Sequence, residues 1–134
     1  MKSFLITITA LILIAFGSCK KDNGTGIPAD TAATIDITTP STMIIYLNGS
    51  NLPVTGTIAD NDVLATAKVE IRNKSTNAIL FQQTDNTGNV GFYRYSWNWT
   101  ISGITGPTPG NVKIISKDKY GYETSRSIDI NFDN

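Results

Sequence analysis

Apolar residues alternate with polar ones along most of this chain, and the clearest alternation runs from Tyr93 to Ile101. One side of the pattern is aromatic or aliphatic and the other is polar: Tyr93, Tyr95, Trp97, Trp99 and Ile101 against Arg94, Ser96, Asn98 and Thr100. Side chains of a β-strand point alternately to opposite faces, so the pattern predicts a long strand with one aromatic face. Val90 and Phe92 are out of phase with this row, which indicates a bulge or a bend near Gly91.

The aromatic face has two interpretations that exclude each other. Tyrosine and tryptophan side chains in a row can stack on sugar rings at a protein surface. A half-buried strand of a layered β-protein is also where large aromatic residues pack as core. We favour the core, which requires a second layer of strands to cover this face.

Segments with the same period of two follow one another at regular spacing. They cover residues 33–38, 43–47, 52–59, 64–73, 78–84, 112–117 and 123–132. Pro40 separates the first two, and because proline cannot donate to a ladder, the break suits a first strand that switches sheets. Turn residues separate most of the others, including Asp60-Asn61-Asp62 and the run 85–89. The pattern predicts an all-β fold, a single seven- to eight-stranded antiparallel β-sandwich over residues 32–134.

The first 18 residues have the pattern of a secretory signal peptide. Lys2 is followed by an apolar run from Phe4 to Phe16, which is shorter than the stretch of about 20 residues that a membrane-spanning helix needs. Small residues then precede Cys19, the only cysteine of the chain. This arrangement resembles the lipobox of bacterial lipoproteins, which implies cleavage before Cys19 and a diacylglycerol on its thiol. An ordinary signal peptide with an incidental cysteine is the alternative.

Residues 19–31 predict a flexible tether, because they are rich in Gly, Asp, Lys and Pro. Their opening, Ser-Cys-Lys-Lys-Asp, resembles that of lipoproteins from Bacteroidetes-type bacteria. The resemblance implies an outer-membrane lipoprotein on the cell surface, with the periplasm-facing leaflet as the alternative. Asp30-Thr31-Ala32 resembles the site that such bacteria O-glycosylate, which implies a glycan on Thr31; an unmodified loop is the alternative reading.

Composition removes several classes of function. Eleven basic residues balance eleven acidic ones, so the basic patch that nucleic-acid binding needs is not expected. The chain has no histidine, which excludes a Ser-His-Asp triad and an imidazole zinc site. With Cys19 carrying lipid, no thiol remains for catalysis. We therefore expect a protein that is not an enzyme and that needs no organic cofactor.

Two short motifs resemble bacterial immunoglobulin-like domains. Gly56-Thr-Ile58-Ala-Asp60, followed by Leu64, is similar to the passage from strand B to strand C, where the glycine lets the sheets approach. Residues 116–121, Ser-Lys-Asp-Lys-Tyr-Gly, are similar to the turn from strand F to strand G. The resemblance implies an immunoglobulin-like or fibronectin-type sandwich, a fold that serves many functions.

In such a sandwich the loops after several strands gather at one end, and here they carry Asp60, Asp62, Asp85 and Asp118. Carboxylate oxygens are ligands that Ca²⁺ prefers, so the four acids predict a calcium site. The alternative is that these aspartates accept hydrogen bonds from turn backbones. Tyr120 and Tyr122 are predicted to be exposed at a turn and to form a ligand-binding surface.

Together these features predict a membrane-attached module of the cell envelope that acts without catalysis. The first expectation is adhesion to, or binding of, a surface protein or other ligand. A glycan-binding accessory lipoprotein of a polysaccharide-uptake system is the second, and a purely structural envelope protein is the third.

Overall fold

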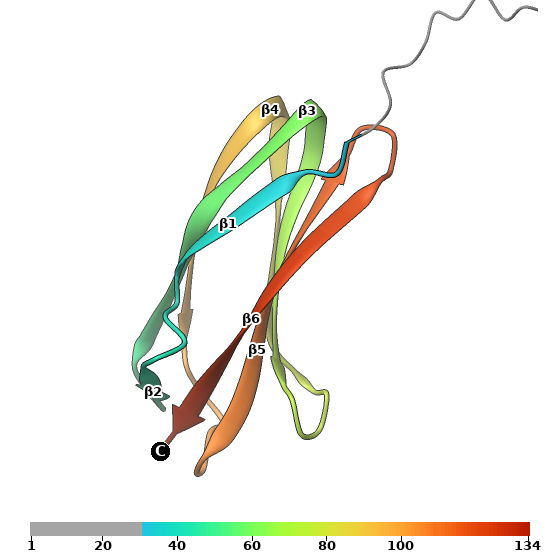
Figure 1. Ribbon diagram of the computed structural model, residues 1–134. Helices are drawn as coiled ribbons and strands as arrows, with labels where there is room; N and C mark the ends of the chain where they lie inside the picture. Colours follow the sequence, from blue (N-terminus) through green and yellow to red (C-terminus); the bar gives the residue numbers. More distant parts are fainter. Residues whose placement is uncertain (1–30) are drawn as a thin grey trace, which may run out of the picture.

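The computed structural model describes residues 31–134, so the predicted signal peptide, Cys19 and the tether up to residue 30 lie outside the described residues. The fold of the described part is all-β (Figure 1), with six strands: β1 (Thr34–Thr39), β2 (Ile45–Leu47), β3 (Asn51–Asn73), β4 (Ile79–Thr100), β5 (Thr108–Asp118) and β6 (Glu123–Asp133). Within this part, no helix has the length and apolar character needed to cross a membrane.

All six strands belong to one hydrogen-bonded sheet that curls on itself. The order is β1-β3-β5-β6-β2, and β4 pairs with β3 along both halves of that strand. The first half of β3 lies beside β1, whereas its second half lies beside β5. The long β3–β4 hairpin therefore arches from one side of the molecule to the other, and the sheet forms a curled half-barrel (Figure 1).

The expectation of seven or eight separate strands is wrong, because two pairs of them are continuous. The segments 52–59 and 64–73 are both parts of β3. The segments 78–84 and 93–101 are parts of β4, except for Ala78 and Ile101 at their outer ends. The loops expected at 60–62 and 85–89 lie inside these strands. The register shifts between Ala59 and Leu64, opposite Val90 and Phe92, so an irregularity bends the hairpin without ending it.

The sequence predicted that bend, and it also predicted the change of partner near Pro40. β1 pairs with β3 in antiparallel orientation, whereas β2 pairs with the end of β6 in parallel orientation. Pro40 lies in the connection between the two strands. β1 and β2 thus pair with opposite sides of the curled sheet, as the position of Pro40 indicated.

The aromatic row is core, which excludes it as a sugar-stacking surface. Tyr95, Trp97 and Trp99 are 0%, 2% and 7% exposed, and the rings of Tyr95 and Trp97 stack with their centroids 4.8 Å apart. Side chains that alternate inward from β3 and β5 complete the core, among them Leu52, Val54, Ile58, Val69, Ile71, Val112 and Ile114. The period of two therefore identified the buried positions correctly.

Gly56 has a specific packing role in this core. It pairs with Tyr95 across β3 and β4, and the Tyr95 hydroxyl donates a 2.7 Å hydrogen bond to the carbonyl oxygen of Asp36 on β1. A Cβ atom on Gly56 would clash with both the Asp36 oxygen and the Tyr95 ring. The glycine thus lets an aromatic ring lie directly against the β3 backbone.

Candidate functional site

One end of the domain, which we call the tip, consists of residues 60–63, 90–92 and 119–122. Asp118 stands at its base and is only 4% exposed. Its Oδ1 accepts hydrogen bonds from the backbone N–H groups of Tyr120 and Tyr122, both at 2.8 Å, while Gly121 takes a φ of 96°. One oxygen of Asp118 therefore stabilises the turn, as the alternative reading of this residue expected.

Two other carboxylate oxygens at the tip have no such partner. Asp60 Oδ1 accepts a 3.0 Å hydrogen bond from the backbone N–H of Asp62, but Asp62 Oδ2 and Asp118 Oδ2 are buried without a hydrogen-bond partner. Buried oxygens without donors suit a cation. Among residues 31–134, however, no three side chains of the Asp, Glu, His or Cys type are grouped to hold a metal ion. Calcium binding at Asp60, Asp62 and Asp118 stays a prediction.

Asp85 is engaged elsewhere, within β4 rather than in a loop. Its Oδ2 accepts hydrogen bonds from the Trp97 indole Nε1 at 2.6 Å and from the Tyr93 hydroxyl at 2.9 Å. Both donors belong to the other half of the same bent strand, so the carboxylate bridges the two sides of the half-barrel. Burial raises the pKa of Tyr93, and the hydrogen bond to Asp85 and the charge of that acid raise it further.

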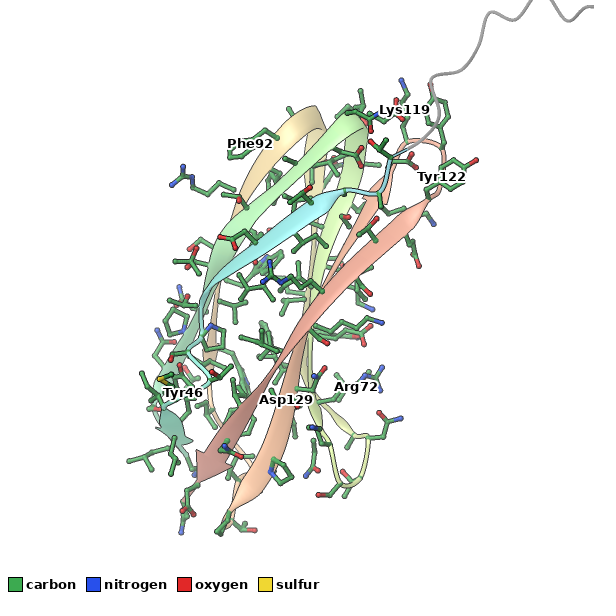
Figure 2. The ribbon with its side chains drawn as sticks, viewed as in Figure 1. Tyr46, Arg72, Phe92, Lys119, Tyr122 and Asp129 are labelled. Carbon is green, nitrogen blue, oxygen red and sulfur yellow. The ribbon has the colours of Figure 1, made fainter. Side chains whose placement is uncertain are left out.

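Exposed aromatic side chains gather at the tip. Tyr120 and Tyr122 are 55% and 60% exposed, and the ammonium group of Lys119 lies 4.7 Å from the centre of the Tyr120 ring. Phe92 is 55% exposed as well, although the sequence did not single it out as a site residue. Its place in the alternation could have revealed this exposure, because Phe92 is out of step with the buried aromatic row. Figure 2 shows Phe92, Lys119 and Tyr122 near this end of the molecule.

Thr31, the first described residue, also lies at the tip. Its hydroxyl is 2.6 Å from the side-chain amide of Asn61, and the backbone N–H of Ala33 donates to Thr124 Oγ1 at 3.2 Å. The chain thus enters the domain beside the bend of β3. A glycan on Thr31 stays a prediction.

The opposite end carries an exposed apolar surface, which we call the β2 patch: Met43, Ile44, Ile45 and Leu47, with exposed fractions of 94%, 52%, 59% and 51%. β2 is the last strand in the sheet order, and among residues 31–134 its outer edge has no strand partner. Tyr46, labelled in Figure 2, points the other way and packs against the core. Alternation along β2 therefore leaves Ile45 and Leu47 facing solvent, and Met43 and Ile44 precede the strand.

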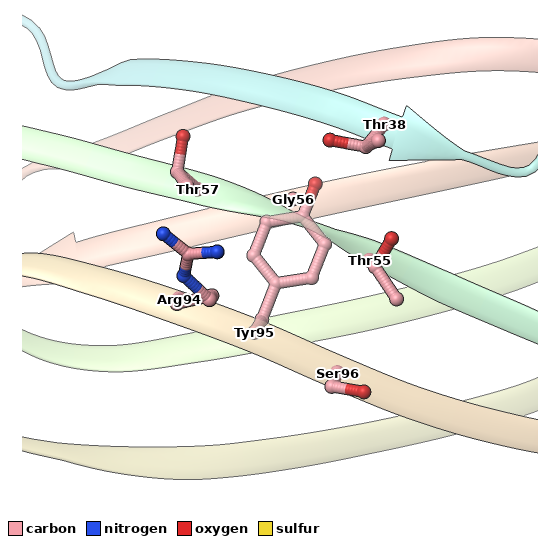
Figure 3. A pocket seen from close by; sticks show the side chains of 7 residues that line it. All are labelled: Thr38, Thr55, Gly56, Thr57, Arg94, Tyr95 and Ser96. Carbon is pink, nitrogen blue, oxygen red and sulfur yellow. The ribbon is translucent and has the colours of Figure 1, made fainter.

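A shallow polar hollow lies on the outer face of β1, β3 and β4 (Figure 3). Its volume is about 300 Å³, and hydroxyl groups and one guanidinium line it: Thr38, Thr55, Thr57, Ser96 and Arg94, with Gly56 and Tyr95 at its floor. Within the described chain, no acidic side chain forms an ion pair with Arg94. The sequence did not reveal this site, because its residues come from three strands and form no motif.

The comparisons with known proteins identify the fold and leave the function open. No protein-family model matches the sequence, and no curated protein matches it. Among solved structures, the chain is similar to the fibronectin(III)-like modules of Clostridium thermocellum CbhA, with 14% identity, a TM-score of 0.50, and coverage of 76% of this chain and 46% of the other. It is also similar to Spo0M, a sporulation control protein from Bacillus subtilis, with 13% identity, a TM-score of 0.55, and coverage of 78% and 50%.

The chain thus spans about half the length of each of these structures. At such low sequence identity, the similarity is evidence for the fold only. The described domain has a fold of the fibronectin type III-like kind, as the sequence motifs implied.

Proposed function

We propose that this protein is a non-enzymatic, lipid-anchored module of the bacterial cell surface that binds a partner protein through the β2 patch. The single observation that carries the proposal is the exposure of four large apolar side chains within five consecutive positions, 43–47. Apolar residues exposed singly are common, whereas a contiguous exposed group marks an interaction site. The free edge of β2 adds backbone donors and acceptors that a partner strand can pair with.

We further interpret the curled sheet as an immunoglobulin-like sandwich. The inward side chains of its two halves meet in one core, and the Asp85 carboxylate bonds across the gap between them. Such domains commonly present their edges and end loops to partners. The β2 patch is a surface of that kind.

The partner proposal is tested with a photo-crosslinking side chain at position 45 of the surface-displayed, full-length protein. The matched control carries the same group in place of Ser127, which is exposed on β6. We expect a discrete protein adduct from position 45 and none from position 127. Absence of an adduct at position 45, or the same adducts at both positions, would refute binding at the β2 patch.

The anchor is tested separately with Cys19→Ser. Without the thiol, lipid transfer and the cleavage that depends on it should both fail, so the precursor should persist and the protein should leave the detergent phase. A Cys19→Ser protein that still takes up labelled lipid, or that is cleaved normally before residue 19, contradicts the lipoprotein assignment.

Glycan binding is the second candidate, and the polar hollow favours it. Its hydroxyl groups and the Arg94 guanidinium can form hydrogen bonds with sugar hydroxyls or a sugar carboxylate, and a volume of about 300 Å³ suits one or two rings. A glycan array with the mature protein tests this idea, with Arg94→Ala as the variant and Lys113→Ala on β5 as the control. Binding that Arg94→Ala abolishes and Lys113→Ala retains would support it. If neither partner nor glycan binds, the structural envelope role remains.

A further inference from the structure

We propose that the tip lies on the lipid surface to which Cys19 is anchored, with its exposed aromatic side chains inserted among the lipid headgroups. This inference rests on the lipid anchor proposed above, and it adds a defined orientation of the domain to that anchor. The membrane would then contact the protein at two places, the lipid on Cys19 and the tip.

The three segments of the tip form one continuous surface. The backbone N–H of Lys119 donates a 2.9 Å hydrogen bond to the carbonyl oxygen of Val63, which joins the turn 119–122 to the bend of β3. Residues 90–92 pack against the other side of this bend, since a Cβ atom on Gly91 would lie 3.3 Å from the Asp60 carbonyl oxygen. These two contacts hold all three segments together at one end of the domain.

The side chains that the tip exposes are of the types that prefer the interface between water and lipid. Val90, Phe92, Tyr120 and Tyr122 are 39%, 55%, 55% and 60% exposed, although each is large and apolar or aromatic. Tyrosine rings favour the headgroup level, where the ring is in contact with lipid and the hydroxyl with water. Lys119, beside Tyr120, has a long stem that can lie along lipid while its charge stays in water.

The charges of the tip indicate which lipid it suits. The tip contains two acidic residues, Asp60 and Asp62, and one basic residue, Lys119, and Asp118 stands at its base, so the tip has no excess of positive charge. Attraction to anionic lipids therefore cannot drive the contact. Insertion of the aromatic side chains can, and we expect the tip to bind neutral phospholipid.

The entry point of the chain makes the tip the end nearest to the anchor. The described chain begins at the tip, where Thr31 lies beside Asn61 and where β1 starts with Thr34 opposite Ala59. Cys19 precedes Thr31 by twelve positions, a spacer that has a root-mean-square span of about 20 Å when it is flexible. An anchored Cys19 thus keeps the tip at a high local concentration near lipid, where weak insertion is sufficient.

The same orientation directs the β2 patch away from the membrane. β6 starts next to the tip at Glu123 and ends beside β2 at Asp133, as Figure 1 shows. Its eleven residues span about 35 Å at the usual rise per residue. The apolar surface proposed to bind a partner would therefore face the medium.

The test places a fluorescent side chain at each end of the anchored protein. The mature chain, beginning at Cys19, is coupled through its only thiol to a maleimide phospholipid in phosphatidylcholine vesicles. Tyr122→Trp reports on the tip, with Phe92→Trp as a second reporter there, and Ile45→Trp reports on the β2 patch. Trp97 and Trp99 are buried and give the same background in every variant. Brominated phosphatidylcholine quenches an indole that enters the lipid.

We expect the added indole in Tyr122→Trp and Phe92→Trp to shift its emission to the blue and to lose intensity in brominated vesicles, as a side chain at the interface would. The indole of Ile45→Trp should keep its intensity. Quenching at neither end, equal quenching at both, or quenching at position 45 alone would overturn the proposal, as would binding of the tip to a glycan but not to lipid. Because the coupling is chemical, failure of lipidation in cells is detected separately with Cys19→Ser.

Discussion

Asp85 should be a main contributor to stability, because its carboxylate bonds across the two sides of the half-barrel. In Asp85→Ala the indole N–H of Trp97, a residue that is only 2% exposed, loses its 2.6 Å acceptor and is left without a partner in the protein. A lost hydrogen bond to a charged group that leaves a buried donor unpaired costs about 1.5–3 kcal/mol. Tyr93 is only partly buried, so in the variant its hydroxyl can bond to water instead. The loss of its hydrogen bond to Asp85 therefore adds only about 0.5–1 kcal/mol to the cost of the substitution.

We therefore expect Asp85→Ala to lower the free energy of unfolding by about 2–4 kcal/mol. Urea unfolding followed by far-ultraviolet circular dichroism measures the loss without relying on tryptophan emission. Asp85→Asn keeps one acceptor oxygen and should lose less. Glu123→Ala, which removes an exposed β6 carboxylate that has no ion pair among residues 31–134, is the matched control and should leave the midpoint nearly unchanged.

A double-mutant cycle separates this explanation from a general defect. In a Trp97→Phe background there is no indole donor to leave unpaired, so Asp85→Ala should cost clearly less than it does in the wild type. The reasoning is refuted if Asp85→Ala changes the free energy of unfolding by less than about 0.5 kcal/mol, the usual scatter for surface substitutions. An equal cost in both backgrounds would refute it as well.

Four further predictions follow from single sites. Trp99→Ala should cost about 3–5 kcal/mol in urea unfolding, since the side chain is core, and a loss below about 1 kcal/mol would contradict that. Gly56→Ala should cost about 1–3 kcal/mol or prevent folding, because the added Cβ meets backbone; wild-type stability would contradict the packing role. The pKa of Tyr93 is raised above its ordinary 10.0, so its contribution to stability should persist below pH 10 and be lost at higher pH, and Tyr93→Phe should weaken that dependence. Calcium should raise the melting temperature by several degrees, more than magnesium does, and Asp118→Asn should abolish the shift; a melting curve that neither calcium nor a chelator moves would leave Asp118 as a turn-stabilising residue.

The period of two predicted which side chains are buried because one face of each strand must meet the core whatever the strand's neighbours are. Ala67, Val69 and Ile71 occupy alternate positions of the predicted segment 64–73, and all three are 0% exposed. The exposure of Phe92 could be predicted in the same way, because this residue is out of step with the buried row. These positions depend on local geometry alone, which a sequence contains.

The strand boundaries and the role of Asp85 depend on contacts that are distant in sequence, and the prediction was wrong there. The run 60–62 has the composition of a turn, yet pairing with β4 and β5 on either side of the bend keeps the ladder almost continuous. The sequence places Asp85 in a loop, because its partners, Tyr93 and Trp97, come close to it only after β4 bends. Tertiary pairing overrides local turn preference in such hairpins.

The residues most informative about function are those that the fold itself does not require. Trp97 and Tyr95 are explained by the core, and Gly56 by the ring that packs against it. Met43 and Tyr122, at opposite ends of the domain, are explained by neither, since both are more than half exposed. A surface selected only for solubility would replace such side chains by polar ones, because their exposure has a free-energy cost and favours aggregation. This small domain thus exposes apolar side chains at both ends. Both surfaces are explained if one end contacts lipid beside the proposed anchor and the other contacts a partner.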